Sequence, residues 1–420
     1  MINKPRGTED ILPADTPLWR KIEQTAHDVC KTFGFSEIRT PVFEDTSLFQ
    51  RGVGDTTDVV QKEMYTFEDK GGRSITLRPE GTASLARSFI ENSLYANPQP
   101  TKLYYLISCY RYEKPQSGRL REFHQFGIEC FGGTSDATDA EVISLALTFF
   151  EKLGINDLKL NLNSIGCPVC KKEYNEKLRA YFEGYRDELC ETCKNRLEKN
   201  PMRIIDCKSE VCSHIAEDAP KMIDNLCETC KNHFDKTTAY LDSVGIEYEI
   251  NPNIVRGLDY YTRTVFEITS DALGAQSTVC GGGRYNGLVE ELGGKATEGI
   301  GFAVGIERLV MIMKAQGLAD GEAFAPDIFV AAIGDSADIA AQKLVHSLRL
   351  NGLAAERDLC ERSVKAQMKF ANKLGSRFSI VLGDDEITEG RADLKNMSTG
   401  EVTSVNLNAD EISAIITQGR

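Results

Sequence analysis

Apolar side chains recur every three or four residues in two stretches of the first half of the chain, which predicts an amphipathic helix in each. The first stretch stops at Gly34 and the second at Gly154, and glycine commonly follows the last turn of a helix. We expect the inward-facing positions to belong to the hydrophobic core. They are Leu18, Ile22, Ala26, Val29 and Phe33, then Ile143, Leu147, Phe150 and Leu153.

Alternating apolar and polar positions predict strands between and after these helices. We expect strands over residues 35–42, 158–162 and 262–268, a strand running into a polar turn over 76–82, and two strands joined by a long loop within 103–131. Pro41 interrupts the first of these. Proline has no N–H to donate to a neighbouring strand, so this strand is expected at a sheet edge or at a dimer interface.

Two glycine-rich segments follow. The run from Gly281 to Gly287 predicts a loop through which backbone can approach a ligand closely. Residues 299–308 predict a strand that runs into a helix. Gly299, Gly301 and Gly305 leave one face of that strand without side chains, which makes room for a flat ligand.

Beyond a predicted linker at 317–325, strands and helices alternate, which predicts a small α/β domain with a mixed sheet. Its expected elements are strands at 328–333, 352–357 and 378–382, helices at 337–350 and 364–375, a paired segment near 391–405 and a closing helix. Lys365, Lys369 and Lys373 recur on one face of a helix. Such a stripe usually marks a solvated face, and contact with RNA is the alternative.

The composition narrows the class of protein. A chain of 420 residues exceeds what one hydrophobic core usually serves, so two or three domains are expected. No apolar run reaches transmembrane length, and residues 1–8 lack the apolar core of a secretion signal, so we expect a soluble, cytoplasmic protein. The formal net charge of -14 argues against a non-specific nucleic-acid binder but allows one specific nucleic-acid partner held by local basic patches.

The 13 cysteines argue for reduced thiols or metal ligands, not for disulfides. Most of them lie in residues 163–251, a helical stretch that breaks the strand pattern and is interpreted as an insertion. Two pairs have the spacing of a four-thiolate zinc site, with reduced structural thiols as the alternative. These candidate ligands are Cys167, Cys170, Cys190 and Cys193.

Two further cysteine pairs lie in the same stretch, at residues 207 and 212 and at residues 227 and 230. The last pair is the weaker metal candidate, because Cys230 falls in an apolar stripe at helical spacing and is interpreted as a core residue.

The candidate chemistry centres on residues 256–267. Arg256 offers a fixed fork of donors that suits a phosphate or a carboxylate. Tyr260 and Tyr261 offer flat apolar walls with hydroxyls that can bond a polar ring. An ordinary strand entered through a glycine turn is the alternative.

The strands within 103–131 carry polar residues on a face that would be apolar if it served only to pack the core. Period-two spacing places Arg111 and Glu113 on one face, and Phe123, Gln125, Gly127 and Glu129 on one face of the partner. A solvated face is the alternative, but unpaired polar groups on a buried face are costly, so a binding floor is favoured. Glu80 and Thr82 point from a nearby turn, and Arg308 lies where a helix begins and could close over a phosphate.

Together these motifs resemble the class II aminoacyl-tRNA synthetases and, within them, the histidyl-tRNA synthetases. The helix, strand and Pro41 are similar to the first class motif, Arg111-Tyr-Glu with the Phe123 strand to the second, and residues 299–309 to the third. Arg256-Gly-Leu-Asp-Tyr-Tyr and Gly282-Gly-Arg-Tyr are similar to the two elements peculiar to the histidine enzymes. Lys114 and Asn286 depart from residues common in the family, at positions given no chemical role.

The resemblance implies an α+β fold with an antiparallel catalytic sheet flanked by helices. It implies a catalytic domain in two parts, residues 1–165 and 251–320, a helical cysteine-rich insertion at 166–250, and an anticodon-binding α/β domain at 326–420. The implied reaction joins L-histidine to tRNA(His) with ATP and Mg²⁺ in a homodimer. The family does not as a rule need zinc.

The resemblance also implies roles for the candidate residues. Arg111 and Arg256 would hold the α-phosphate of ATP, Glu113 and Phe123 the adenine, and Arg308 the γ-phosphate. Arg111 would also hold the carboxylate of the amino acid. The histidine ammonium and ring would be held by Glu80, Thr82, Gln125, Glu129, Tyr260, Tyr261 and Tyr285.

Three alternatives stay open at this point. The first is a catalytically silent paralogue that serves as a regulatory subunit in histidine biosynthesis; it would be expected to lack the last domain and the active-site arginines. The second is a class II synthetase for threonine, proline or glycine. The third is an interaction protein organised by zinc.

Overall fold

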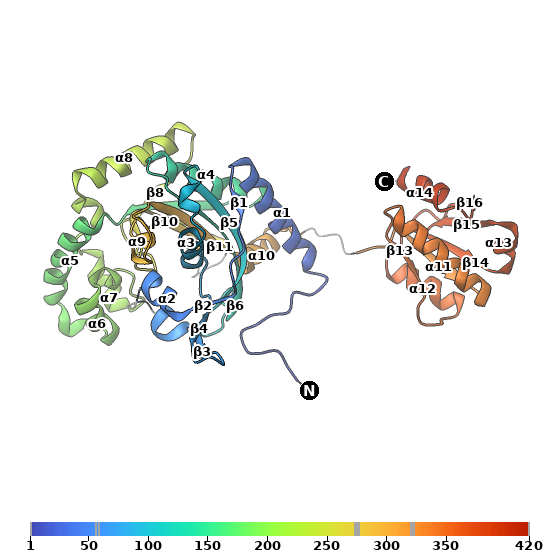
Figure 1. Ribbon diagram of the computed structural model, residues 1–420, viewed down its shortest axis with the longest axis horizontal. Coiled ribbons are helices and arrows are strands. Elements are labelled where there is room, and N and C mark those ends of the chain that lie inside the picture. The colour runs from blue at the N-terminus through green and yellow to red at the C-terminus, as the bar shows by residue number, and fades with distance from the viewer. Residues whose placement is uncertain (1, 55–56, 58, 273–277, 320–323, 419–420) are drawn as a thin grey trace. The chain divides into compact units, whose positions relative to one another are not determined.

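The computed structural model describes residues 2–54, 57, 59–272, 278–319 and 324–418. The chain divides into two compact units, residues 1–320 and 321–420 (Figure 1). Part of the linker predicted at 317–325 lies outside the described residues. Within the described ranges, no helix is long and apolar enough to cross a membrane.

A large sheet forms the centre of the first unit. Its strands are β1 (Ser36–Glu37), β5 (Thr101–Tyr110), β6 (Glu122–Phe131), β7 (Leu158–Ser164), β8 (Glu249–Ile250), β9 (Thr262–Ser270), β10 (Thr278–Arg284) and β11 (Gly299–Gly305). In the described part of the chain these eight strands follow the order β1-β5-β6-β11-β10-β9-β7-β8. The inner pairs are antiparallel, and the outermost pairs, β1 with β5 and β7 with β8, are parallel.

The strand expected at 35–42 does lie at a sheet edge, as Pro41 predicted, but it is shorter than expected. Pairing stops after Glu37. A second, antiparallel sheet begins just beyond, with β2 (Phe43–Asp45) and β3 (Tyr65–Glu68) on either side of β4 (Ser74–Leu77).

Helices cover both faces of the large sheet. One face carries α1 (Thr16–Thr32), α4 (Ala137–Lys152) and α10 (Ile306–Ala315). Most of their predicted inward residues are buried there against the sheet, with Phe126, Phe266 and Phe302 at the centre. Toward the other face lie α2 (Thr46–Val53), α3 (Thr82–Glu91) and α9 (Leu288–Glu291), with the short turns η1 (Val59–Glu63) and η2 (Leu94–Ala96).

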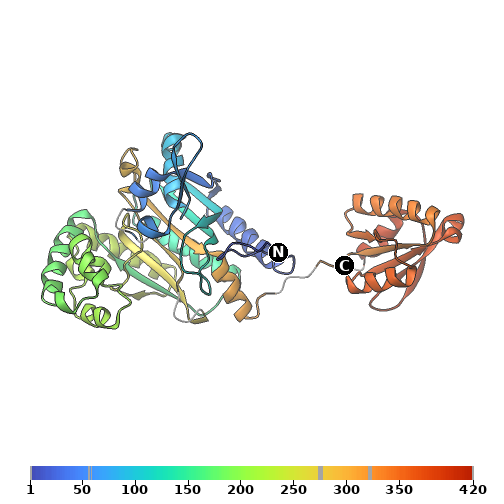
Figure 2. The ribbon, with the colours of Figure 1, turned by 90° about the horizontal axis from the view of Figure 1, so that it is seen from below.

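The cysteine-rich insertion leaves the sheet after β7 and returns at β8. It consists of α5 (Pro168–Glu183), η3 (Arg186–Glu188), α6 (Glu191–Lys199), η4 (Pro201–Ile204), α7 (Glu210–Glu217), η5 (Met222–Asn225) and α8 (Glu228–Ser243). These helices, green in Figure 1, gather at one side of the sheet in both views (Figures 1 and 2).

A buried polar cluster joins the insertion to the large sheet. Asp139 of α4 is fully buried, and its carboxylate lies 2.7 Å from Nε of the equally buried Arg284 in β10. The same carboxylate contacts His233 of α8 and accepts a hydrogen bond from Thr264 of β9 at 3.3 Å. Buried charges persist where they are paired, so this cluster fixes α8 against α4, β9 and β10.

The glycine run at 281–287 is a strand for half its length, so the expectation of a loop is wrong there. Gly281, Gly282 and Gly283 belong to β10, between β9 and β11. A Cβ on Gly282 would lie 2.4 Å from the carbonyl oxygen of Gly301, so close strand approach, not turning, accounts for the glycine there.

The face alternation expected for β9 holds only from Thr264 onward. Arg263 has a positive φ of 49°, and the register with β10 shifts between Gly283 and Arg284. This is a bulge, in which one strand contributes extra residues. The Arg263 carbonyl accepts a hydrogen bond from Ile165 at 2.8 Å, and its N–H donates to Gly166 at 2.9 Å, so the bulge ties the sheet to the start of the insertion.

The second unit is the mixed α/β domain that alternation of strands and helices predicted. Its sheet follows the order β13-β12-β14-β15-β16, with parallel pairing around β12 and antiparallel pairing from β14 on. The strands are β12 (Ile328–Ala332), β13 (Ala355–Arg357), β14 (Phe378–Leu382), β15 (Arg391–Asn396) and β16 (Val402–Asn406). The helices are α11 (Asp335–Leu350), α12 (Val364–Lys373), α13 (Asp384–Glu389) and α14 (Ala409–Gln418).

Helix α13 was not predicted, because its six residues are too few to show a helical period. A side-chain cap supports it. The Glu386 carboxylate accepts a hydrogen bond from the Gly383 N–H at 2.8 Å.

Gly127 of β6 provides a test of the packing under the sheet. A Cβ there would lie 2.3 Å from Cζ and Oη of the buried Tyr105 in β5, so the space next to Gly127 is filled by the ring of Tyr105. We expect Gly127→Ala to lower the free energy of unfolding by about 1–3 kcal/mol through overpacking, measured by urea denaturation. Gly287→Ala is the matched control, since nothing lies within 4 Å of a Cβ at that exposed glycine, and equal losses in both variants would contradict this account.

Candidate active site

A cavity of about 1010 Å³ opens in the first unit. All twelve candidate residues taken from the sequence line it, although they come from segments up to 228 positions apart (Glu80 to Arg308). They are Glu80, Thr82, Arg111, Glu113, Phe123, Gln125, Glu129, Arg256, Tyr260, Tyr261, Tyr285 and Arg308.

Arg111 follows the end of β5 and is not part of the strand, so the period-two argument does not apply to it. Its Nε donates to the carbonyl of Pro79 at 2.8 Å, and its guanidinium lies over the Phe123 ring, 5.3 Å from the centroid. The Glu113 carboxylate forms a salt bridge with the Arg119 guanidinium in the following loop, with an N–O distance of 3.2 Å. The ring of Phe123 and the carboxylate of Glu113 are therefore held on the same side of the cavity as Arg111.

Arg256 is held on the other side of β11. Its guanidinium is ion-paired with Glu267 of β9 and occupies the space that a side chain on Gly281 would need, since a Cβ there would lie 2.1 Å from a guanidinium nitrogen. Gly281 and Glu267 are direct cross-strand partners. Because Gly281 has no side chain, the Arg256 guanidinium has room to pair with Glu267. The Glu267 charge holds the Arg256 guanidinium firmly protonated, with a raised pKa, against the opposing effect of burial.

Two buried carboxylates lie deeper in the cavity. Glu129 accepts hydrogen bonds from Thr82 at 2.7 Å and from the Tyr285 hydroxyl, and burial raises its pKa to about 8. Glu80 accepts from the backbone N–H groups of Thr82 and Ala83, at 2.7 and 2.8 Å, which begin α3. Burial also raises the pKa of Glu80, although these hydrogen bonds oppose the shift. The pair provides acceptors for a cationic or hydrogen-bond-donating ligand.

Three tyrosines line the cavity near the two buried carboxylates. The Tyr260 ring lies 4.7 Å from Tyr261 and 5.7 Å from Tyr285, measured between centroids, and all three rings are buried. Gln125 extends toward the same space from β6 and accepts a hydrogen bond from the Cys109 thiol at 3.3 Å. Flat walls with polar edges suit a small planar ring that carries donors and acceptors.

Arg308 lies in the first turn of α10 and lines the cavity. Its Nε donates to the Gly118 carbonyl at 3.2 Å, and another guanidinium nitrogen donates to the Thr278 carbonyl of β10. These contacts join the loop at 116–121 to the sheet. Burial and the nearby Arg119 lower the pKa of Arg308.

The glycines of β11 leave less open space than the sequence suggested. A Cβ on Gly299 would lie 2.1 Å from the Tyr285 ring, and one on Gly301 would lie 2.0 Å from a Glu129 oxygen. The protein's own side chains therefore use much of this bare face, and only Gly301 and Gly305 line the cavity.

Sequence reasoning missed several lining residues. Glu267 falls in the strand expected at 262–268 and was given no role. Its ion pair with Arg256 and its hydrogen bond from Thr278 at 3.0 Å were not predicted. A signal was available, because an arginine that is partly removed from solvent favours an acidic partner nearby. Asp206 and Lys208 of the insertion also line the cavity, and no local pattern indicated that.

The grouping of cysteines expected from the sequence is wrong. Among the described residues, the thiols of the insertion gather in two separate clusters. Cluster A contains Cys167, Cys170, Cys227 and Cys230, and cluster B contains Cys190, Cys193, Cys207 and Cys212. Cys230 is buried, as expected of a core residue, but its sulfur lies within cluster A. The pairs that are adjacent in the sequence fail to meet because α5 separates them, whereas the return of the chain at α8 brings the last pair beside the first.

Comparison with families of known proteins agrees with this architecture. The family model described as histidyl-tRNA synthetase matches residues 7–309, and the model described as an anticodon binding domain matches residues 327–418. The chain is 59% identical over 403 residues to a histidine–tRNA ligase of Acetivibrio thermocellus, covering 96% of this chain and 97% of that protein. It is 54% identical over 404 residues to a histidine–tRNA ligase of Clostridioides difficile, covering 96% of each.

Solved structures give the same result for the fold. The crystal structure of apo histidyl-tRNA synthetase from S. aureus is similar with a TM-score of 0.83 at 43% identity, covering 100% of this chain and 99% of that chain. A structure of an ATP phosphoribosyltransferase regulatory subunit/histidyl-tRNA synthetase from Bacillus halodurans is similar with a TM-score of 0.64 at 22% identity, covering 91% of this chain and 98% of that chain. At 22% identity, the similarity to the Bacillus halodurans structure shows a shared fold only.

Glu129 gives the site a measurable pH dependence. Its pKa of about 8 in the folded protein lies above that of an unfolded carboxyl group, about 4.3, so folding favours the protonated form. The contribution of Glu129 to the free energy of unfolding should therefore be constant below about pH 4.3, fall by roughly 1.4 kcal/mol per pH unit between about 4.3 and 8, and level off above.

The measurement is urea denaturation across this pH range for the unchanged protein and for Glu129→Gln. We expect the variant to lose this slope, because an amide does not titrate. Titrating groups that do not interact with Glu129 are common to both proteins and cancel in the difference. An identical pH dependence in the two proteins would contradict the raised pKa.

Proposed function

The chain belongs to the histidyl-tRNA synthetase family, and from that premise we propose that it is a histidine–tRNA ligase: it activates L-histidine with ATP and transfers the amino acid to the 3′ end of tRNA(His). The observation that carries the proposal is the cavity itself. It holds guanidinium groups on either side of β11 and, deeper, two buried carboxylates enclosed by three tyrosines.

The nucleotide would occupy the side of the cavity that contains Arg111. Phe123 supplies a flat face on which adenine can stack, and the adjacent Glu113 carboxylate can accept from the exocyclic amine. Arg308 would hold the γ-phosphate, exchanging its backbone carbonyl partners for phosphate oxygens. Mg²⁺ enters with ATP as part of the substrate and screens the remaining phosphate charge.

Histidine would occupy the end that Glu129 and Glu80 line. Its ammonium and imidazole N–H groups are donors, and Glu80, Thr82, Gln125 and Glu129 provide the acceptors they require. Tyr260, Tyr261 and Tyr285 enclose the ring. An amino acid with an apolar side chain would leave these buried polar groups unpaired, which accounts for selectivity.

The first reaction is in-line attack of the histidine carboxylate on the α-phosphorus, which expels pyrophosphate and leaves histidyl-adenylate. In this proposal Arg111 and Arg256 approach the α-phosphate from opposite sides and stabilise the charge that develops there. No protein nucleophile is needed, so positioning and charge stabilisation provide the catalysis. In the second reaction the terminal ribose hydroxyl of tRNA attacks the activated carbonyl and releases AMP.

The second unit would bind the anticodon of the tRNA, consistent with the family match at residues 327–418. We further propose a cytoplasmic homodimer whose catalytic core comprises residues 1–165 and 251–320, with the insertion at 166–250. The regulatory paralogue is disfavoured as an alternative, because Arg111, Arg256 and Arg308 all line the cavity and the last domain is present.

The direct test is exchange of pyrophosphate into ATP with each of the twenty amino acids. We expect exchange with histidine alone and without tRNA, because adenylate formation uses only groups in this cavity. Exchange with a different amino acid would refute the histidine assignment. No exchange with any of them would favour the silent paralogue.

Replacing Arg256 tests the role of the second guanidinium. We expect Arg256→Ala to reduce the rate of adenylate formation by about 10²- to 10³-fold with little change in histidine affinity, because the contact matters mainly in the transition state. Single-turnover kinetics and equilibrium histidine binding measure the two quantities.

The matched control removes the acid that this substitution leaves unpaired. An Arg256→Ala/Glu267→Gln protein should stay as slow as Arg256→Ala. Recovery of the rate in the double variant would show that the unpaired Glu267 charge, not the missing guanidinium, caused the loss.

A further inference from the structure

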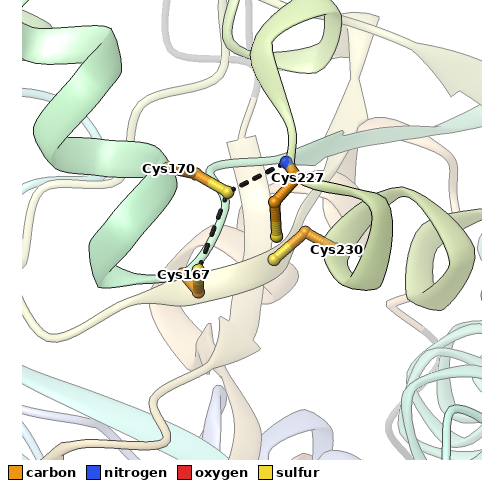
Figure 3. A group of neighbouring side chains, drawn as sticks. All are labelled: Cys167, Cys170, Cys227 and Cys230. Atoms are coloured by element: carbon orange, nitrogen blue, oxygen red, sulfur yellow. Dashed lines mark hydrogen bonds between the residues drawn. The ribbon is translucent and has the colours of Figure 1, made fainter.

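The thiols of cluster A converge on one point between two helices. Cys167 and Cys170 come from the start of α5, Cys227 and Cys230 from the start of α8, and the four side chains point toward one another (Figure 3). The sulfur atoms of Cys167 and Cys170 are 3.6 Å apart. Four sulfurs bound tetrahedrally to zinc at about 2.3 Å would be separated by about 3.8 Å, which matches this spacing.

Cluster B repeats the same geometry. Cys190 and Cys193 lie at the start of α6, while Cys207 and Cys212 flank the start of α7. The Cys190 and Cys207 sulfurs are 3.9 Å apart, again close to the edge of a zinc-centred tetrahedron. In both clusters all four ligand atoms lie within 4.8 Å of one another.

The backbone around both clusters suits thiolates. Cys167, Cys190 and Cys227 each occupy the position just before a helix, where exposed N–H groups favour negative charge. The N–H of Cys227 donates to the Cys170 sulfur at 3.2 Å, and the N–H of Cys190 donates to the Cys212 sulfur at 3.2 Å. Four thiolates in a tetrahedron, none replaced by water or carboxylate, are the donor set of a structural zinc site.

Each cluster is also directly connected to the segment 256–261. Beside cluster A, Lys171 follows Cys170 in α5, and its ammonium group donates to the Tyr261 carbonyl. Gly166, which precedes Cys167, accepts the hydrogen bond from Arg263 of the β9 bulge.

Beside cluster B, η4 approaches the same segment from another direction. Arg203 donates to the Gly257 carbonyl at 2.7 Å and to the Asp259 carboxylate at 3.1 Å, and Asn200 donates to Asp259 at 3.2 Å. Asp206 and Lys208, on either side of Cys207, line the cavity.

We propose that each cluster binds one structural Zn²⁺ through four thiolates, and that the two ions fix α5 and η4 so that Lys171 and Arg203 hold the backbone of residues 256–261 in place. The insertion is then a zinc-stabilised brace for the segment that carries Arg256 and the two tyrosines. Lys171 and Arg203 are positioning residues, since they contact the segment and not the reacting atoms.

The metal content of the full-length protein tests the first part. In protein prepared without added metal, we expect two zinc ions per chain by elemental mass spectrometry, and X-ray absorption should show four sulfur neighbours at about 2.3 Å. Cys167→Ser/Cys170→Ser and Cys190→Ser/Cys193→Ser should each reduce the count to one. Cys360→Ser, at an exposed thiol of the second unit, should leave it at two.

If a double variant does not fold, the zinc count of the unchanged protein still decides the matter. Fewer than two zinc ions per chain would overturn the two-site proposal. So would iron in place of zinc, or mixed oxygen ligation in the absorption spectrum.

The bracing role is tested by hydrogen exchange and kinetics, and this part rests on the proposed function. Removal of zinc by a chelator should increase amide exchange in residues 256–261 and leave β15 and β16 of the second unit unchanged, and added zinc should reverse the effect. The KM for histidine in pyrophosphate exchange should rise by about tenfold to 10²-fold, the size of effect that a misplaced site residue produces.

Lys171→Met offers a test that keeps both metal sites. It should raise the KM for histidine while the zinc count stays at two, and Lys172→Met, at the exposed neighbouring position, should change neither. Unchanged exchange in 256–261 after zinc removal, or an unchanged KM in Lys171→Met, would overturn the bracing role. Absence of histidine-dependent exchange in zinc-loaded protein would refute the proposed function and leave the metal count standing.

Discussion

The ion pair between Arg256 and Glu267 is the interaction on which the site depends. A guanidinium placed over a sheet needs a counter-charge and space, and here β9 supplies the carboxylate while β10 supplies the space by having glycine at position 281. Both side chains are partly buried, so removing one partner would leave the other charge partly desolvated and without its counter-charge.

Much of the fold could be predicted from the sequence because its elements have clear periods. The helices at 16–32 and 137–152, the mixed sheet of the second unit and the edge position of the Pro41 strand all follow from local pattern. The glycine run at 281–283 was misassigned because glycine permits both turns and close strand pairing, and only the neighbouring strands decide between them. The bulge at Arg263 likewise depends on partners that are distant in sequence.

The candidate site was predicted in part of its membership but not in its internal contacts. Resemblance to a family identified twelve residues that line the cavity and missed others, among them Glu267. The pairing of Arg256 with Glu267 and the packing of Tyr105 under Gly127 arise between separate strands. For the cysteines, too, the sequence indicated the residues but not their contacts. Spacing within each pair indicated metal ligation, but the choice of which pairs meet depends on how α5 and α8 pack, and sequence spacing contains no information on that.

The parallel pairing of β7 with β8 has a consequence for how this architecture can change. Asn161 and Leu162 pair with Glu249 and Ile250, so the insertion begins and ends at neighbouring strands that run in the same direction. Parallel neighbours cannot be joined by a tight hairpin and need a crossover of a dozen or more residues. A shortened insertion must therefore still provide a crossover of this length, and deleting it completely would also remove or reverse an edge strand.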